Sequence, residues 1–95
     1  MLHLKNLTWR QCKEMRILEI GKFCEVCGRR FERNELIGHH LLGRKYMKEN
    51  NLVIPELCEL RDKDCEAECH KSFYNGNPPK SLIRIAKWKS ESPQF

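Results

Sequence analysis

Apolar residues in the first quarter of the chain follow a partly helical spacing. This run consists of Trp9, Cys12, Leu18 and Ile20. Thr8 followed by Gln11 is the pattern of a capping box at the start of a helix. Gly21 is a residue type that often ends one. The pattern therefore predicts an opening helix over residues 8–20.

Two short apolar runs in the middle of the chain predict a β-hairpin. The first lies within residues 31–42, and the second covers residues 52–54 and stops at Pro55. Residues 43–50 between them are mostly polar. We therefore expect two short antiparallel strands joined by a polar loop.

The last third of the chain predicts two helices. One runs from about Cys65 to Tyr74, and the Asn, Gly and Pro residues at 75–79 end it. Pro79 suits the first position of a final helix over residues 79–89. Its apolar positions, expected to pack inward, are Leu82, Ile83, Ala86 and Trp88.

Length and composition limit the class of protein. A chain of 95 residues has room for one hydrophobic core, so we expect residues 1–95 to form a single domain. The mean hydropathy is −0.69, and no segment approaches the roughly 20 apolar residues of a membrane span. The N-terminal residues do not read as a secretion signal. These features predict a cytoplasmic α+β protein with no membrane partner.

The charge is positive overall but unevenly distributed. Eighteen Lys and Arg stand against 13 Asp and Glu, which gives a formal net charge of +5. The acidic residues are concentrated between Glu56 and Glu68, with basic segments on both sides. This balance suits a polyanionic partner, and we expect the acidic segment to lie away from it.

Six cysteines in so short a chain indicate either disulfides or a metal site. An intracellular setting keeps thiols reduced and favours metal. Cys24-x-x-Cys27 has the spacing of two zinc ligands on one turn. Our first choice for the ligand set is Cys24, Cys27, Cys58 and Cys69, with Cys65 as the alternative to Cys58. We expect Cys12, on the opening helix, to be a buried thiol.

Histidines and an asparagine form a second group with chemical potential. Adjacent residues on a strand point to opposite faces, so His39 and His40 should have different tasks. One imidazole can bind a metal ion while the other accepts a proton near neutral pH. His70, on a helix packed against the hairpin, can reach the same ion.

The order of these motifs resembles the HNH endonuclease family, also called ββα-metal nucleases. The resemblance is carried by Cys24-x-x-Cys27, His39-His40, Asn51-Leu52 leading into Leu57-Cys58, and Cys69-His70. It implies a treble-clef-like core over residues 23–77, in which a zinc knuckle supports a ββα unit. The terminal helices are additions to that core. The expected fold class is therefore a small zinc-stabilised α+β domain.

The resemblance also implies roles for single residues. His40 is the expected general base, and His39 and His70 are the expected ligands of a catalytic divalent ion. Asn51 would fix the hairpin loop and, through it, the base. The implied reaction is hydrolysis of DNA phosphodiester bonds with Mg²⁺, Mn²⁺, Ni²⁺ or Zn²⁺, beside a structural Zn²⁺.

Two positions depart from the family pattern. Many members carry a further His or Asn four residues after the helix histidine, and this chain has Tyr74 there. The second cysteine pair is usually closely spaced, whereas ten residues separate Cys58 from Cys69. The first departure leaves the ion short of a protein ligand, and the second leaves the fourth zinc ligand open.

DNA contacts are expected mainly from Arg44 and Lys45, which follow the paired histidines. Lys48, Lys71 and Lys80 are weaker candidates. The chain lacks a basic recognition helix, so we expect phosphate contacts to dominate over base recognition. A monomer and a homodimer are both compatible with the sequence.

Two other functions fit part of the pattern. A treble-clef zinc module that binds nucleic acid or protein without chemistry fits the cysteines, and Tyr74 favours it. A thiol redox protein fits Cys24-x-x-Cys27 alone, but the chain lacks the βαβ pattern of a thioredoxin-like domain. The His39-His40 pair favours the nuclease, because a binding module does not need a metal ligand beside a proton acceptor.

Overall fold

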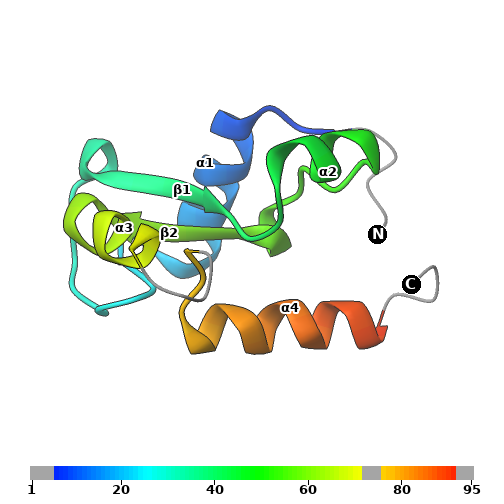
Figure 1. Ribbon diagram of the computed structural model, residues 1–95. Helices are drawn as coiled ribbons and strands as arrows, with labels where there is room; N and C mark the ends of the chain where they lie inside the picture. The colour runs from blue at the N-terminus through cyan, green and yellow to red at the C-terminus, as the bar shows by residue number, and fades with distance from the viewer. Residues whose placement is uncertain (1–5, 72–75, 92–95) are drawn as a thin grey trace.

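The computed structural model describes residues 6–71 and 76–91, which form helices around a two-stranded antiparallel sheet (Figure 1). The α-helices and strands, in chain order, are α1 (Trp9–Ile20), β1 (Leu36–His40), α2 (Arg44–Glu49), β2 (Cys58–Asp62), α3 (Lys63–His70) and α4 (Pro79–Glu91). Single 3₁₀ turns at Arg33–Glu35 and Pro55–Leu57 lead into the two strands. The predicted α+β class is confirmed, while the treble-clef topology stays a prediction.

The pairing of β1 with β2 fixes which side chains share a face. Leu36 lies opposite Asp62 and His40 lies opposite Cys58, with His39 opposite Glu59 between them. Because side chains alternate along a strand, His39 and His40 point to opposite faces, as predicted. Figure 1 shows α1 on one side of the sheet and α4 on the other.

The opening helix is confirmed, together with its capping box. The Thr8 side chain accepts a hydrogen bond from the Gln11 amide at 3.0 Å, and the Gln11 side chain accepts one from the Thr8 amide at 2.9 Å. Gly21 follows the helix with φ 92°, a conformation that residues with a Cβ rarely adopt. The predicted buried thiol is also confirmed, because Cys12 is 1% exposed.

Two apolar clusters form the core on the α1 side. The first consists of Cys12, Met47, Val53, Leu57 and Cys58, and the second of Ile17, Cys24, Leu36 and Leu60. Each cluster joins α1 to the sheet, and the first also takes in α2 through Met47. The opening helix therefore anchors both halves of the hairpin.

A buried ionic layer covers the opposite face of the sheet. Arg61 is fully buried, and its Nε donates to Glu59 Oε1 at 2.8 Å. Ser81 on α4 donates to the other oxygen of Glu59 at 2.5 Å. Buried polar groups are tolerated when they are hydrogen-bonded, so this layer can pack against α4 through Ser81.

The predicted hairpin is wrong in two places. Residues 44–49 of the predicted loop form the short helix α2, and residues 52–54 are not a strand. The second strand lies at Cys58–Asp62, where all five residues are buried. Its polar side chains are buried by pairing with other polar groups, which a search for apolar alternation cannot detect.

The two later helices match the prediction in position but not in detail. Helix α3 begins at Lys63 rather than Cys65, because the Asp62 carboxylate accepts from the amides of Asp64 and Cys65. The predicted extension to Tyr74 falls on residues 72–75, outside the described residues. Helix α4 begins at Pro79, as predicted.

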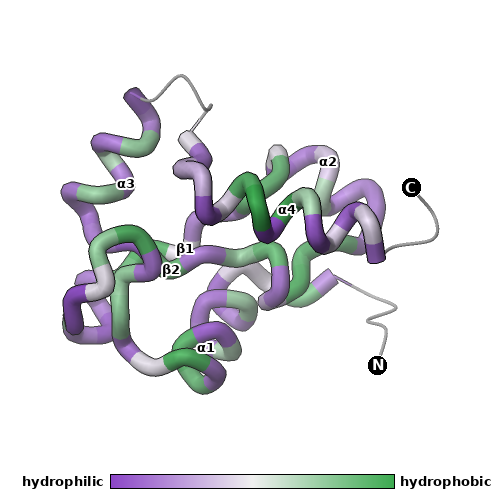
Figure 2. The backbone as a smooth tube through the Cα atoms, turned by 90° about the horizontal axis from the view of Figure 1, so that it is seen from below, coloured by the Kyte–Doolittle hydropathy of each residue, from purple (hydrophilic) through white to green (hydrophobic). Residues whose placement is uncertain are grey.

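The predicted inward face of α4 is wrong at three of its four positions, while Trp88 is half-buried and packs against the first apolar cluster. Ser81 and Ile85 are buried, whereas Leu82, Ile83 and Ala86 are exposed. The hydroxyl of Ser81 sets the helix rotation by its bond to Glu59, so a polar residue faces inward. Figure 2 shows hydrophobic and hydrophilic positions mixed along α4. None of the helices in residues 6–71 and 76–91 has the length and hydropathy of a membrane span.

Truncation of a core leucine tests the packing. Leu60 is fully buried in the second apolar cluster, so we expect Leu60→Ala to lower the free energy of unfolding by about 2–5 kcal/mol. Leu18 on α1 is 81% exposed, so we expect Leu18→Ala to change it by less than about 0.5 kcal/mol. Urea unfolding of both variants measures the difference. Equal losses would contradict this assignment of the core.

Candidate functional site

Three thiols and one carboxylate gather where the segment after α1 meets the start of α3. The ligand atoms of Cys24, Cys27, Asp62 and Cys65 all lie within 4.8 Å of one another. We call this group the sulfur cluster. Cys24 is buried and Cys27 is exposed, so the cluster lies at the edge of the core.

A tight turn presents the first two thiols. The Cys24 amide donates to the Arg29 carbonyl at 2.9 Å, and the Gly28 amide donates to the Cys24 carbonyl at 2.8 Å. Gly28 has φ 77°, in the left-handed region that favours glycine. Glu25 fastens the turn to β2, because its amide donates to the Leu60 carbonyl and its carboxylate accepts from the Leu60 amide, both at 2.7 Å.

Asp62 serves both the helix and the sulfur cluster. Its Oδ2 caps α3, while its Oδ1 lies 3.5 Å from the Cys27 sulfur. Burial raises the pKa of the Asp62 carboxyl, but hydrogen bonds from Cys65 and Cys24 outweigh burial and hold that pKa far below its usual range. Asp62 is therefore an anion with one oxygen directed at the thiols.

The sulfur cluster fits a metal ion. Three sulfurs and one carboxylate oxygen match the number and type of ligands in a closed tetrahedral zinc site. Burial raises the pKa of Cys24 and of Cys65, so forming these thiolates without a cation is unfavourable. A bound cation would supply the missing positive charge.

The structure brings together only part of the predicted cysteine set. Cys24 and Cys27 lie in the sulfur cluster, and the third thiol is Cys65, the alternative of the sequence analysis. Cys58 is buried in the first apolar cluster, where burial raises its pKa to about 12. Neither Cys58 nor Cys69 belongs to the sulfur cluster.

Asp62 was missed as a candidate ligand, although its spacing carries a signal. Asp62-x-x-Cys65 repeats the spacing of Cys24-x-x-Cys27, with an aspartate in the position of the first cysteine. The capping position of Asp62 places it next to the thiol three residues later. A sequence motif that requires two cysteines does not detect the pair of Asp62 and Cys65.

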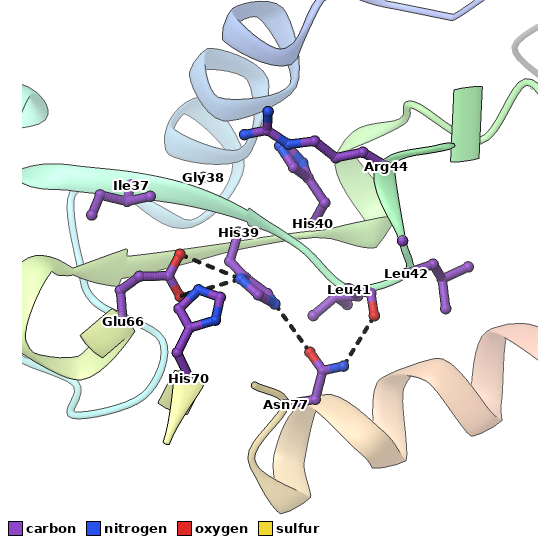
Figure 3. A pocket seen from close by; sticks show the side chains of 11 residues that line it. Ile37, Gly38, His39, His40, Leu41, Leu42, Arg44, Glu66, His70 and Asn77 are labelled. Carbon is purple, nitrogen blue, oxygen red and sulfur yellow. Dashed lines mark hydrogen bonds and ion pairs between the residues drawn. The ribbon is translucent and has the colours of Figure 1, made fainter. Parts of the chain in front are cut away.

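A second group lies on the opposite face of the sheet. The ligand atoms of His39, Glu66 and His70 lie within 4.8 Å of one another, and we call them the histidine–glutamate cluster (Figure 3). His39 Nδ1 is 3.2 Å from Glu66 Oε1, and His70 Nε2 is 3.6 Å from the same oxygen. Glu66 and His70 share a helix face because they are four residues apart on α3.

The structure therefore confirms that His39 and His70 lie close together and adds a carboxylate between them. Glu66 was missed because it belongs to the acidic segment, which we expected to lie away from any phosphate. Its side chain is mostly buried and accepts a hydrogen bond from Arg61 Nη1 at 3.0 Å. Burial raises the pKa of Glu66, but His39 and Arg61 outweigh burial and lower it.

The histidine–glutamate cluster fits a divalent ion. Two imidazoles and one carboxylate are common ligands of first-row transition metals. Burial and the charge of Arg61 lower the pKa of His39, which favours the unprotonated ring that a metal requires. The side chain of His70 is 62% exposed, so solvent and an anionic substrate can reach the group.

Asn77 lies on the other side of the His39 ring. Its Oδ1 is 3.2 Å from His39 Nε2, and its Nδ2 donates to the Leu41 carbonyl at 3.1 Å. Figure 3 shows the His39 ring between Glu66 and Asn77. The sequence pattern predicts only a turn at residue 77.

His40 occupies the α1 side of the sheet. Its ring centroid is 4.1 Å from that of Trp9, and the Arg44 guanidinium lies 5.6 Å from the Trp9 ring centroid. Burial, then Arg44 and His39, lowers the pKa of His40 from 6.5 to about 4. Nδ1 of His40 is buried and has no hydrogen-bond partner within the described residues.

One pocket of about 490 Å³ is lined by both His39 and His40. Figure 3 shows that the end of β1 separates the histidine–glutamate cluster from His40 and Arg44. The polar or charged residues that line the pocket are His39, His40, Arg44, Glu66, His70 and Asn77. A phosphate group that enters it could therefore meet a metal ion, a neutral imidazole and a guanidinium.

Two predicted residues lie outside this pocket. Lys45 is exposed on α2. Asn51 is exposed with φ 56°, a left-handed conformation that asparagine tolerates, and it turns the chain after α2. No hydrogen bond links the Asn51 side chain to His40 within residues 6–71 and 76–91, so its effect on the base stays a prediction.

Comparison of the chain with models of protein families, with curated proteins and with solved structures finds no match. Membership of the HNH family therefore stays a prediction. The chemistry that the site can perform therefore depends on the two clusters and the pocket.

Cobalt binding tests which thiols hold the metal. Co²⁺ bound by thiolates absorbs strongly in the near ultraviolet, so we expect this signal for the wild-type protein. We expect Cys65→Ser to weaken Co²⁺ binding by at least about 10-fold, because one of four ligands is lost. Cys69→Ser, four residues along the same helix, should leave it unchanged. The reverse order would contradict the assignment and support the set first predicted from sequence.

The environment of His40 predicts a pH dependence of stability. Its pKa is near 6.5 in the unfolded chain and about 4 in the folded protein, so the unfolded state binds more protons between these values. This contribution to the free energy of unfolding is complete above pH 6.5 and falls as the pH drops toward 4. Denaturation across this range, without added divalent ions, should show a weaker dependence for His40→Phe. An identical dependence in both proteins would contradict the burial of a neutral ring.

Proposed function

We propose that the protein is a metal-dependent endonuclease that hydrolyses DNA phosphodiester bonds. The observation that carries this proposal is the pocket that joins the histidine–glutamate cluster to His40 and Arg44. A candidate metal centre, a proton acceptor and a phosphate-binding cation are the three groups that such a hydrolysis needs. The order of motifs in the sequence supports the same reaction.

Two ions have separate tasks in this proposal. The sulfur cluster holds a structural Zn²⁺, which stabilises a chain with a small apolar core. The histidine–glutamate cluster holds the catalytic ion, which is Mg²⁺, Mn²⁺, Ni²⁺ or Zn²⁺. Glu66 supplies the third protein ligand, which the family pattern places at the position of Tyr74. Its hard oxygen makes manganese and magnesium better candidates than two imidazoles alone would.

The catalytic ion, when bound, would draw charge from a phosphate oxygen and stabilise the departing 3′-oxygen. His40 accepts the proton of the attacking water as the water oxygen bonds to phosphorus. The bond to the 3′-oxygen breaks, that oxygen acquires a proton from solvent, and the product carries a 5′-phosphate. Arg44 lies beside His40 and pairs with the phosphate.

The low pKa of His40 suits the start of this reaction. A ring with a pKa of about 4 is unprotonated at neutral pH and can accept a proton. Arg44 is a principal cause of the shift after burial, and a bound phosphate would offset the charge of Arg44. Substrate therefore raises the basicity of His40 when a base is needed.

The charge distribution supports a DNA partner. Arg44, Lys45 and Lys48 are exposed on α2, and Arg44 also lines the pocket. The formal net charge of the chain is +5, which favours a polyanionic partner. We expect contacts to phosphate to dominate, in a monomer or a homodimer.

One observation favours a second function. Trp9 lies against the His40 ring, and Nδ1 of that ring is buried, so the proposed base is partly covered. A zinc module that binds nucleic acid or protein without chemistry would have no need of an accessible imidazole. The exposed ring of His70 and the open pocket favour the nuclease.

Cleavage of supercoiled plasmid by the zinc-loaded protein distinguishes these functions. We expect nicking that requires added Mg²⁺, Mn²⁺ or Ni²⁺. Loss of the base in His40→Ala should lower the rate by about 10²–10⁴-fold. Glu66→Gln should lower the cleavage rate because the divalent ion binds more weakly. A higher Mn²⁺ concentration should restore part of that rate.

Glu68→Gln is the matched control for Glu66→Gln. Glu68 lies on the same helix, but its side chain is 77% exposed and its ion pair within the described residues is with Lys71. This variant should cleave at the wild-type rate. No cleavage with any ion, by folded protein that still binds DNA, would contradict the nuclease and support the noncatalytic module.

A further inference from the structure

Helix α1 carries two cations that the proposed reaction does not use. Arg10 and Lys13 are three residues apart, so they lie on the same side of the helix. Arg10 is exposed and Lys13 is half-buried. Within residues 6–71 and 76–91, neither side chain forms an ion pair or a hydrogen bond. Both charges are therefore available to an anion from outside the fold.

Two contacts place α1 along β1, the strand that lines the pocket of Figure 3. The Trp9 ring lies against His40, with 4.1 Å between the ring centroids. One helical turn later, a Cβ atom added at Gly38 would lie 3.2 Å from Lys13 Cβ. Glycine within a strand often marks the close approach of another segment, and here that segment is α1. Lys13 thus lies beside a residue that lines the pocket.

A second hollow, of about 590 Å³, lies against the same helix, and we call it the α1 hollow. The residues that line it are Arg10, Lys13, Glu14, Glu32, Arg33 and Asn34. Its two carboxylates already have partners, because Glu14 pairs with Arg33 and Glu32 pairs with Lys22. Arg10 and Lys13 are therefore the cations that the α1 hollow can offer to an anionic ligand.

The cations of the α1 hollow continue a line that starts in the pocket. The Arg44 guanidinium lines the pocket and lies 5.6 Å from the Trp9 ring centroid, next to the first turn of α1. In Figure 1, α2 and the start of α1 lie with β1 in the upper part of the molecule, whereas α4 lies at the bottom. The line of cations therefore runs along one edge of the protein. A ligand with repeated negative charges can reach both hollows at once, which a single small anion cannot.

We propose that Arg10 and Lys13 bind backbone phosphates of the DNA next to the phosphate in the pocket, so that the duplex lies along α1 as well as α2. The inference rests on the proposed nuclease, which places one phosphate at Arg44. Basic side chains that contact phosphates set the position of the duplex and carry no sequence information. Arg10 and Lys13 thus extend the binding surface and leave its expected low sequence specificity unchanged.

Fluorescence anisotropy of a labelled duplex at several salt concentrations measures the phosphate contacts without any measurement of cleavage. Each contact that is lost reduces the slope of log affinity against log salt by about 0.9. We expect the double variant Arg10→Gln, Lys13→Gln to bind more weakly and to reduce the slope by about 1.8. Glutamine keeps part of the aliphatic stem of each side chain, so the packing of Lys13 at Gly38 is retained.

The double variant Lys87→Gln, Lys89→Gln is the matched control. It removes the same two charges from exposed positions on α4, across the sheet from α1. We expect its slope to stay close to that of the wild-type protein. An equal reduction in both double variants would show an effect of net charge alone and would overturn the inference.

Acetylation of lysines, followed by mass spectrometry, tests the wild-type protein even if the α1 variants do not fold. We expect the duplex to slow acetylation of Lys13 and to leave that of Lys87 unchanged. Acetylation of Lys13 at the same rate with and without duplex would overturn the inference.

The outcomes separate this inference from the proposed function. If the slope falls and Lys13 is protected as expected while no plasmid is cleaved, the binding surface stands and the nuclease fails. If plasmid is cleaved but the folded Arg10→Gln, Lys13→Gln protein has the wild-type slope, the nuclease stands and the binding surface on α1 fails. A wild-type protein that does not bind the duplex would overturn the inference as well.

Discussion

The antiparallel pairing of β1 with β2 is the constraint on which both candidate metal centres depend. Its register places His39 opposite Glu59 and His40 opposite Cys58, so adjacent histidines fall on opposite faces of a two-stranded sheet. One face receives the α3 side chains of Glu66 and His70 that complete the histidine–glutamate cluster. The other faces α1. A slip of one residue would exchange the two faces and dismantle the pocket.

Helix α3 and its capping residue Asp62 divide their side chains between the two clusters. Asp62 and Cys65 are three residues apart and face the sulfur cluster, whereas Glu66 and His70 are four apart and face His39. A metal ion in the sulfur cluster would therefore hold the helix that supplies two ligands to the other centre. Buried Arg61 strengthens this coupling, because it contacts Glu66 from β2 and the chain beyond α3 at Gly76. The structural ion and the catalytic ion would therefore both be held by ligands from helix α3 or its capping residue.

Local signals predicted much of the fold, and buried polar groups account for what was missed. The capping box at Thr8 and the proline at 79 fixed the starts of α1 and α4, because these signals act within a few residues. Strand β2 was missed because Glu59 and Arg61 are buried by partners distant in sequence. The histidines of the site were predicted from type and order. Glu66 and Asn77 were not, since their roles depend on tertiary contacts with His39.

A crystal structure with Mn²⁺ and a short DNA duplex tests the central claim most directly. Anomalous scattering locates manganese independently of the rest of the density. The expected result is a manganese ion bound by His39, Glu66 and His70, with a DNA phosphate between it and His40. Zinc in the sulfur cluster should give a separate signal on the opposite face. Manganese absent from His39, or a duplex bound away from the pocket, would contradict the proposed nuclease site.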